Sequence, residues 1–295
     1  RYCKKIMSTS DLVLSLGCRL APQFAGHDFK VFKNSYLISV DIEKDELTKK
    51  GCKINLPINE DLKVFLPIFY KFIKKTKLKN FSEWDDECSN LKKSNPMIDS
   101  SYERNPIDLY YFMHKIGEIS HEKNILVTDA GSNYYIGGQV WKFNKGQKEL
   151  TSGSNAAMGL SVPLSIGAAV AKPNYQILAV TGDGSLELNI QELKTISQYK
   201  LNIKLFVINN GGYVSMHNWQ DTFFEGRRVD SSKDTGEGTL NFKNIAKAFE
   251  LEYYKIDNYQ SIDEDLKKIM RDDQPLFVEV LTDHKQKIYD SFKDF

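Results

Sequence analysis

TGDGSLELNIQELKTISQYKLNIKLFVINNGGY, residues 181–213, decides the fold of this chain. The apolar run 176–180 before it and the run 203–208 near its end are short enough to be buried strands, and residues 188–199 have helical spacing. A strand, a tight glycine turn, a helix and a second strand form a right-handed crossover, which makes the two strands parallel and neighbouring. The sequence therefore predicts an α/β fold in which parallel sheets are flanked by helices.

Polar residues follow both predicted strands. Asp183 comes just after the first strand and Asn210 just after the second. Because open α/β sheets bind ligands at the carboxyl edge of their strands, we expect these two side chains to converge there. A carboxylate and an amide oxygen suit magnesium, which completes its octahedron with water and ligand phosphates. The N–H groups of Gly184 and Ser185 and the Ser185 hydroxyl lead into the next helix, so the predicted ligand is a diphosphate carried on magnesium.

The spacing of these residues is more specific than either end alone. Gly182-Asp183-Gly184 by itself is typical of an ordinary turn, but here 24 residues (185–208) separate it from Asn209-Asn210, and a strand precedes each end. This pattern resembles the thiamine diphosphate motif. The resemblance covers most of residues 1–295 and points to the acetolactate synthase (acetohydroxyacid synthase)-like branch of the thiamine diphosphate-dependent enzymes.

The resemblance implies several cofactor contacts before Asp183. Residues 151–168, TSGSNAAMGLSVPLSIGA, resemble the family's glycine-rich segment and helix. Within them Ala156 would contact the cofactor and Met158 would hold it in a bent conformation, with a methionine of the hydrophobic core as the alternative. After the predicted strand 125–128, the family binds the diphosphate through two polar side chains. Ser132 and Asn133 stand at those positions, where the usual pair is Gln-His.

The resemblance also assigns residues after Asn210. The main-chain carbonyl of Gly212 would be the third protein ligand of the metal. The residues that would line the cofactor are Tyr213, Val214 and Ser215. Trp219 falls where acetohydroxyacid synthases carry a tryptophan that shapes the acceptor pocket, with an aromatic anchor for its helix as the alternative. His217 has no partner visible in the sequence, so we interpret it as a surface or packing residue.

Composition excludes some classes of function. The 295 residues are 41% hydrophobic, and 40 Lys and Arg nearly balance 39 Asp and Glu, so no broad basic field for nucleic acid or an anionic membrane is expected. The four cysteines are scattered without a CxxC pair, which favours a reducing cytoplasm over a zinc site or a disulfide framework. No apolar run approaches the ~20 residues of a membrane span.

The chain is expected to contain two domains. Residues 1–78 resemble part of a Rossmann-like middle domain, with strands at 11–17 and 35–42 and a helix at 60–75 that contains a proline. This domain holds FAD in some relatives, but no G-x-G-x-x-G follows the first strand, so a structural remnant is expected instead and FAD is not expected to bind. Residues 79–105 are polar and are predicted to be a linker.

Residues 106–295 are expected to form the thiamine diphosphate-binding domain. Its first helix should open at Asn105-Pro106, as N-cap and first helical residue. Further along, residues 242–249 are predicted to be a helix, 252–256 and 276–281 to be strands, and the lysine-rich end to be an exposed tail.

The resemblance implies magnesium-dependent decarboxylation or carboligation of a 2-oxo acid such as pyruvate. The family's activating glutamate belongs to a pyrimidine-binding domain that nothing in residues 1–295 resembles. The catalytic residue is therefore unknown here and is expected upstream, and the chain alone is expected to be inactive. The implied assembly is a homodimer or homotetramer in which another subunit's pyrimidine-binding domain completes the site.

Two other functions stay open. A related thiamine diphosphate lyase of another pathway, such as cell-surface sugar synthesis, fits the sequence of residues 209–213 equally well. The second alternative is a partner subunit that binds the cofactor but has no catalytic activity. Release of carbon dioxide from pyruvate would separate an enzyme from such a partner.

Overall fold

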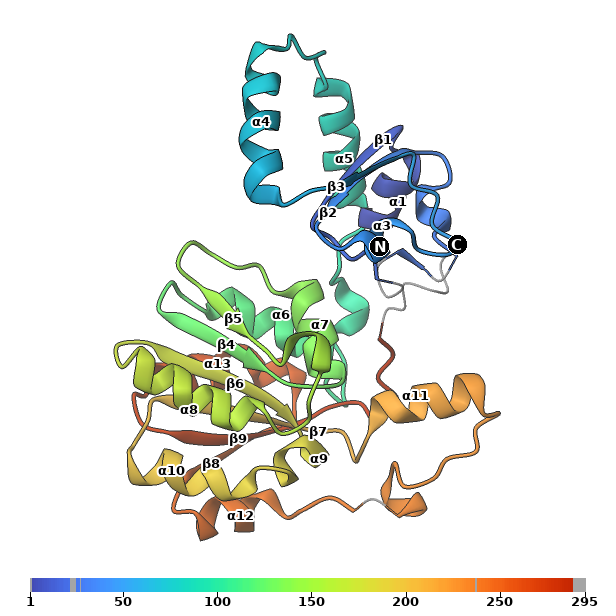
Figure 1. Cartoon of the computed structure of the whole chain (residues 1–295). Helices are drawn as coiled ribbons and strands as arrows, with labels where there is room; N and C mark the ends of the chain where they lie inside the picture. The colour runs from blue at the N-terminus through green and yellow to red at the C-terminus, as the bar shows by residue number, and fades with distance from the viewer. Residues whose placement is uncertain (1, 22–24, 27, 237, 289–295) are drawn as a thin grey trace. The chain divides into compact units, whose positions relative to one another are not determined.

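The computed structural model describes residues 2–21, 25–26, 28–236 and 238–288, and Figure 1 labels its elements. The chain forms two compact units, one that ends at Met97 and one over Ile98–Ile288. The boundary between them falls inside the segment 79–105 that was expected to be a linker. No helix in these described ranges is both long and apolar enough to cross a membrane.

The first unit is built on a small parallel sheet in the order β1-β2-β3. Its strands are β1 (Leu12–Leu16), β2 (Tyr36–Asp41) and β3 (Leu56–Asn59), and its helices are α1 (Tyr2–Thr9), α3 (Lys44–Leu47), α4 (Leu62–Lys75) and α5 (Ser82–Ser94). The predicted strands and the predicted helix are all present. Helix α4 begins where the Asp61 carboxylate accepts a hydrogen bond from the Lys63 N–H at 2.8 Å, and it contains Pro67.

Helix α5 occupies 13 residues of the expected linker. Three half-buried residues, Trp84, Cys88 and Leu91, follow a helical spacing along it. The rest of the helix is polar or charged. The helix was not predicted, because its apolar stripe is sparse and the composition of the segment is typical of a loop.

The second unit contains a six-stranded, fully parallel sheet in the order β5-β4-β6-β7-β9-β8. Its strands are β4 (Asn124–Thr128), β5 (Lys148–Leu150), β6 (Gln176–Gly182), β7 (Ile203–Asn209), β8 (Glu252–Ile256) and β9 (Leu276–Leu281). Strands β6 and β7 are parallel neighbours, with Ile177 opposite Ile203 and Gly182 opposite Ile208, as predicted. Both therefore end on the same edge of the sheet.

Helices cover both faces of this sheet (Figure 1). One face carries α8 (Ser161–Ala171), α10 (Leu193–Gln198) and α12 (Phe242–Ala248), whose apolar side chains share a core with β4, β6 and β7. The other carries α6 (Leu109–Ile119), α7 (Ser132–Val140) and α13 (Ile262–Arg271), where Phe112 of α6 packs edge-on against Phe206 of β7 at 5.5 Å. Burial on both faces explains why the central strands are almost continuously apolar.

Two predicted helices differ from the structure. Within the expected helix over residues 188–199, the structure has a 3-10 turn (Ile190–Glu192) followed by α10, and a separate short helix, α9 (Asp183–Glu187), precedes this range. Asn189 lies between α9 and the turn, and its amide donates to the Gly159 carbonyl at 3.0 Å.

Helix α6 begins at Leu109 and not at Pro106. Its N-cap is Asp108, whose carboxylate accepts from the Tyr110 N–H at 2.9 Å, and the Asn105-Pro106 peptide bond is cis and lies before the helix. A carboxylate is a strong N-cap, so Asp108 determines the start of the helix.

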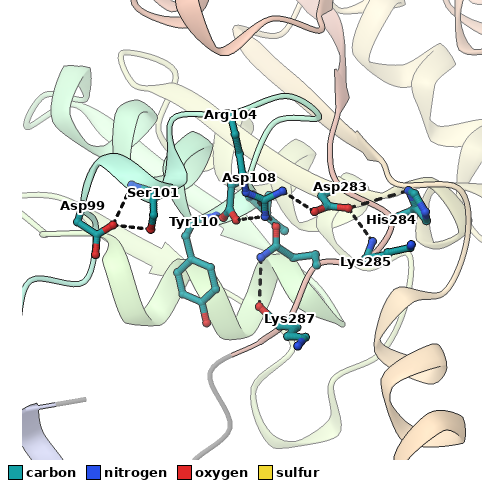
Figure 2. A network of polar contacts seen from close by, with 11 residues as sticks. Asp99, Ser101, Arg104, Asp108, Tyr110, Asp283, His284, Lys285 and Lys287 are labelled. Atoms are coloured by element: carbon teal, nitrogen blue, oxygen red, sulfur yellow. Dashed lines mark hydrogen bonds and ion pairs between the residues drawn. The ribbon is translucent and has the colours of Figure 1, made fainter.

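The segment after β9 is not wholly exposed, contrary to expectation. Arg104 donates to both Asp108 (2.8 Å) and Asp283 (2.7 Å), which joins this segment to the start of α6 (Figure 2). Gln286 is buried and accepts from the Leu109 N–H at 2.8 Å. The remainder of the predicted tail, residues 289–295, lies outside the described residues.

Candidate functional site

The Asp183 carboxylate lies at the centre of the carboxyl edge of the sheet. One of its oxygens, Oδ2, accepts the main-chain N–H groups of Asn210 (3.2 Å), Gly211 (2.9 Å) and Gly212 (3.0 Å), and Oδ1 accepts from Gly184 at 2.9 Å. The structure thus brings together the two ends of the motif, because the turn after β7 wraps around the aspartate that follows β6.

The two glycines of this turn are required by its conformation. Gly211 has φ 80° and Gly212 has φ 127°, in the region that favours glycine. A Cβ atom on Gly212 would also lie 2.6 Å from the Ser231 carbonyl oxygen. The sequence Asn-Asn-Gly-Gly therefore combines a polar side chain with a backbone that can turn tightly around Asp183.

The residues present fit a magnesium ion. Asn210 is buried, and its side-chain Oδ1 has no hydrogen-bond partner among the residues that the structure describes. The Gly212 carbonyl accepts one hydrogen bond, from the Val214 N–H at 3.0 Å, and a carbonyl oxygen has two lone pairs. A carboxylate, an amide oxygen and a carbonyl oxygen are the ligands that this ion prefers.

Burial raises the pKa of Asp183 to about 6, because loss of water outweighs the four N–H donors that favour its charged form. A cation bound beside it would stabilise the carboxylate. The electrostatics of the site therefore also suit a bound positive charge.

The start of α9 is closed by an aromatic ring. A Cβ atom on Gly184 would lie 2.3 Å from Cε1 of Tyr213, so only glycine allows the ring to approach the helix this closely. Ser185, the next residue, is also buried. Three predicted cofactor contacts, Gly184, Ser185 and Tyr213, therefore lie at the start of α9, the helix that begins at Asp183.

The glycine-rich segment packs against the same short helix. A Cβ atom on Gly159 would lie 2.9 Å from the Ser185 carbonyl oxygen. Ala156 has φ 44°, an uncommon conformation for a residue with a side chain, and is half-buried. Met158 is half-buried as well, so it differs from a methionine enclosed in the core and is accessible to a bound molecule.

The turn after β4 joins the site through Asn133. Its amide donates to the Val180 carbonyl (3.0 Å) and to Asp129 (3.2 Å), and its oxygen accepts from the Tyr134 N–H at 2.8 Å. Both the nitrogen and the oxygen of the Asn133 side-chain amide therefore have hydrogen-bond partners within the protein. Ser132 is buried at the start of α7, directly after Gly131.

Asp129 was not among the predicted site residues, and it is fully buried directly after β4. Its carboxylate accepts from the Ala130 N–H at 2.7 Å and from the Thr181 hydroxyl at 3.0 Å. Burial raises its pKa. Its position in the sequence could have marked it as a candidate site residue, because Asp129 directly follows strand β4 and Asp183 similarly follows β6.

Helix α11 (Val214–Phe223) begins at the site and leads away from it. Val214 is buried, and the Ser215 hydroxyl would lie 3.6 Å from a Cβ atom on Gly131, so the start of α11 adjoins the turn after β4. Trp219 is 59% exposed and packs on Phe223 of the same helix at 4.5 Å. Trp219 is thus exposed on α11 and is not packed in the core of this chain.

Trp219 instead lines a shallow surface groove of about 420 Å³. The other residues of the groove are Met216, Gln220, Phe224, Arg227 and Val229. His217, by contrast, is buried, and burial lowers its pKa, as a packing residue would show.

Comparison with known proteins matches this region to a family. The family model described as thiamine pyrophosphate enzyme, C-terminal TPP binding domain, matches residues 129–280, which contain every metal and cofactor residue predicted above. The acetolactate synthase large subunit of Lactococcus lactis is 30% identical over 95% of this chain and 47% of its own length. The probable acetolactate synthase large subunit of Methanococcus aeolicus is 31% identical over 96% and 48%. The chain spans about half the length of these curated relatives.

Proposed function

This chain belongs to the thiamine pyrophosphate enzyme family, and we propose that its second unit binds thiamine diphosphate through a magnesium ion held by Asp183, Asn210 and the Gly212 carbonyl. The observation that carries the proposal is the buried Asn210 Oδ1, which lacks a partner in the described structure beside a carboxylate oriented by three main-chain N–H groups. A buried polar atom without a partner is costly, and a bound cation would satisfy it.

The residues of this chain would bind and orient the cofactor. Ser185 would donate its main-chain N–H to the diphosphate, and Gly184, without a side chain, would let the diphosphate approach the start of α9. Ser132 and Asn133 would lie beside it, although the Asn133 side chain is already bonded within the protein. Met158 would support the bent conformation. When bound, thiamine diphosphate supplies the carbon nucleophile for reactions of 2-oxo acids, while the protein supplies binding, orientation and exclusion of water.

We further propose that the whole protein decarboxylates or carboligates a 2-oxo acid such as pyruvate. The support is the similarity to proteins named acetolactate synthase large subunits. In the proposed assembly, a homodimer or homotetramer in a reducing cytoplasm, a pyrimidine-binding domain of another subunit completes the site. Trp219 would then shape the acceptor pocket. A related lyase of another pathway and a partner subunit without activity are the alternatives.

Calorimetric titration with thiamine diphosphate tests the binding proposal. We expect binding in the presence of magnesium and none after chelation of divalent ions. Equal affinity with and without the chelator would contradict the proposed metal site.

A second measurement tests the reaction. A chain extended to the full length of the relatives should release carbon dioxide from pyruvate, whereas these 295 residues alone should not. Binding without carbon dioxide release by the extended chain would favour the partner subunit, and a screen of products would separate the two kinds of enzyme.

A further inference from the structure

Glu279 is a buried carboxylate in the middle of β9, an interior strand between β7 and β8. The other five residues of the strand are apolar: Leu276, Phe277, Val278, Val280 and Leu281. Burial of a carboxylate in such surroundings is unfavourable unless its oxygens accept hydrogen bonds. The position therefore calls for a reason beyond packing.

Both oxygens of Glu279 accept hydrogen bonds from side chains of the neighbouring strands. Asn209 of β7 donates through Nδ2 to Oε1 at 2.6 Å, and the Tyr253 hydroxyl of β8 donates to Oε2. Burial, together with this contact with the carboxylate, raises the pKa of Tyr253, so the tyrosine remains a donor. Hydrogen bonds to an ionised acceptor are stronger than those between neutral groups. The Glu279 carboxylate therefore bonds to Asn209 through one oxygen, while Tyr253 holds the carboxylate in place through the other.

Asn209 is the last residue of β7 and directly precedes the turn around Asp183. Its main-chain carbonyl accepts from the Thr282 N–H at 3.0 Å, just past the end of β9. Strand β9 therefore holds Asn209 through both its side chain and its main chain. The next three residues then donate their N–H groups to Asp183 Oδ2.

We propose that Glu279 is a positioning residue for the metal site, which acts through Asn209. By holding Asn209, it sets the direction in which the turn leaves β7. That direction keeps the Asn210 amide oxygen and the Gly212 carbonyl beside Asp183. The inference rests on the proposed magnesium site and adds to it a residue that contacts neither metal nor cofactor. Outer partners of this kind typically change metal affinity by about 10-fold to 100-fold.

An exchange of donor and acceptor provides the test. Asn209→Asp places a second carboxylate against Glu279 and removes the donor. The double variant Asn209→Asp/Glu279→Gln restores one donor and one acceptor with the original charge, because the introduced glutamine would donate to the introduced aspartate and accept from the Tyr253 hydroxyl. We expect the single variant to lose about 10-fold to 100-fold in magnesium affinity and the double variant to recover most of it.

Amide hydrogen exchange of Gly211 and Gly212 in the metal-free chain supplies a readout that does not depend on the proposed metal. We expect at least a tenfold faster exchange of both amides in Asn209→Asp and near wild-type exchange in the double variant. Tyr253→Phe should show a smaller increase. The matched control is Tyr254→Phe, whose hydroxyl donates to Asp265 on α13 at 2.6 Å, and it should change neither readout.

The outcomes separate the two proposals. If the wild-type chain binds no magnesium, the proposed function fails, and the amide exchange still decides whether Glu279 positions the turn. If the wild type binds magnesium and Asn209→Asp binds it equally well with unchanged exchange, the role of Glu279 is overturned. A double variant as impaired as the single variant would also overturn it, because the exchange of partners would then have restored nothing.

Discussion

Two turns at the carboxyl edge of the large sheet each begin with a buried aspartate, and the two carboxylates are used differently. Asp183, after β6, accepts only main-chain N–H groups, and the neighbouring Asn210 oxygen has no partner within the described residues. Asp129, after β4, accepts from the side chains of Asn133 and Thr181 as well as from the Ala130 N–H. The first arrangement leaves a polar atom for a ligand, and the second is closed within the protein.

The comparison shows that a carboxylate at a strand end is not sufficient evidence for a metal ligand. Both aspartates are buried, and burial raises the pKa of both. The two aspartates differ in whether the polar atoms beside them have hydrogen-bond partners within the described protein. We therefore expect substitutions at the two turns to affect different properties, metal affinity in one and stability in the other.

The largest expected difference is between Asp183→Ala and Asp129→Ala. Asp183→Ala should lower magnesium affinity by more than about 100-fold, since even outer-shell changes cost about 10-fold to 100-fold. Asp129→Ala should remove the acceptor of the Thr181 hydroxyl and of the Ala130 N–H, and one of the two acceptors of the Asn133 amide, at a cost of about 1–3 kcal/mol in the free energy of unfolding for each donor left unpaired. Calorimetry and denaturant unfolding of both variants measure the two effects. Equal losses of metal affinity in both variants would remove the distinction.

The two asparagines should repeat the contrast with a smaller effect. Asn210→Ala removes an oxygen that has no protein partner in the described chain, so it should lower magnesium affinity by at least about tenfold with little loss of stability. Asn133→Ala removes donors to Val180 and Asp129 and should cost about 1–3 kcal/mol of stability. Thermal unfolding without metal, followed by magnesium titration, separates the two. Strong destabilisation by Asn210→Ala would indicate that its oxygen has a structural partner.

The sequence predicted the strands far better than the helices between them. Buried parallel strands are nearly continuous apolar runs, so β9 was predicted with its observed bounds even though it contains Glu279. The edge strand β8 is only partly buried, but it too was predicted with its observed bounds. The helix predicted over residues 188–199 from its apolar spacing begins as a 3-10 turn and is α-helical only from Leu193. Asn189, just before that turn, is bonded to Gly159, 30 residues away, a contact that no local pattern contains. Helix α13 was not predicted at all.

The same limit applies to the site. Asp183 and Asn210 could be paired because the chain passes directly from β6 to β7 through one crossover. Asp129 and Glu279 were missed because their roles depend on which distant strands are neighbours. Glu279 meets Asn209 only because β9 inserts between β7 and β8, and the two residues are 70 positions apart.

The pH dependence of metal binding should also distinguish the two turns. The pKa of Asp183 is raised to about 6 without metal, so its proton stabilises the folded protein below about pH 4, and this stabilisation is lost as pH rises through 6. Magnesium must displace that proton, so its affinity should fall about tenfold between pH 7 and pH 5. Titrations across this range measure the effect.

The control for this prediction is unfolding without metal. As pH rises through 6, the free energy of unfolding of the wild type should fall relative to that of Asp183→Asn, whose amide does not titrate. Magnesium affinity that stays constant from pH 7 to pH 5 would show that the proton on Asp183 does not compete with the ion.

The smallest expected effect is that of Thr181→Val. The Thr181 hydroxyl is buried on β6 and donates to Asp129 at 3.0 Å, and valine has nearly the same shape without the donor. Loss of one hydrogen bond to a buried carboxylate should lower the free energy of unfolding by about 1 kcal/mol. The hydrogen bond lowers the pKa of Asp129, so its loss should cost most at neutral pH and less in acid, where a protonated Asp129 accepts one hydrogen bond fewer. Magnesium affinity should remain unchanged, because Thr181 supports the closed turn only. Denaturant unfolding at neutral and acidic pH, beside a magnesium titration, tests both statements, and a loss of affinity in Thr181→Val would show that the two turns are coupled.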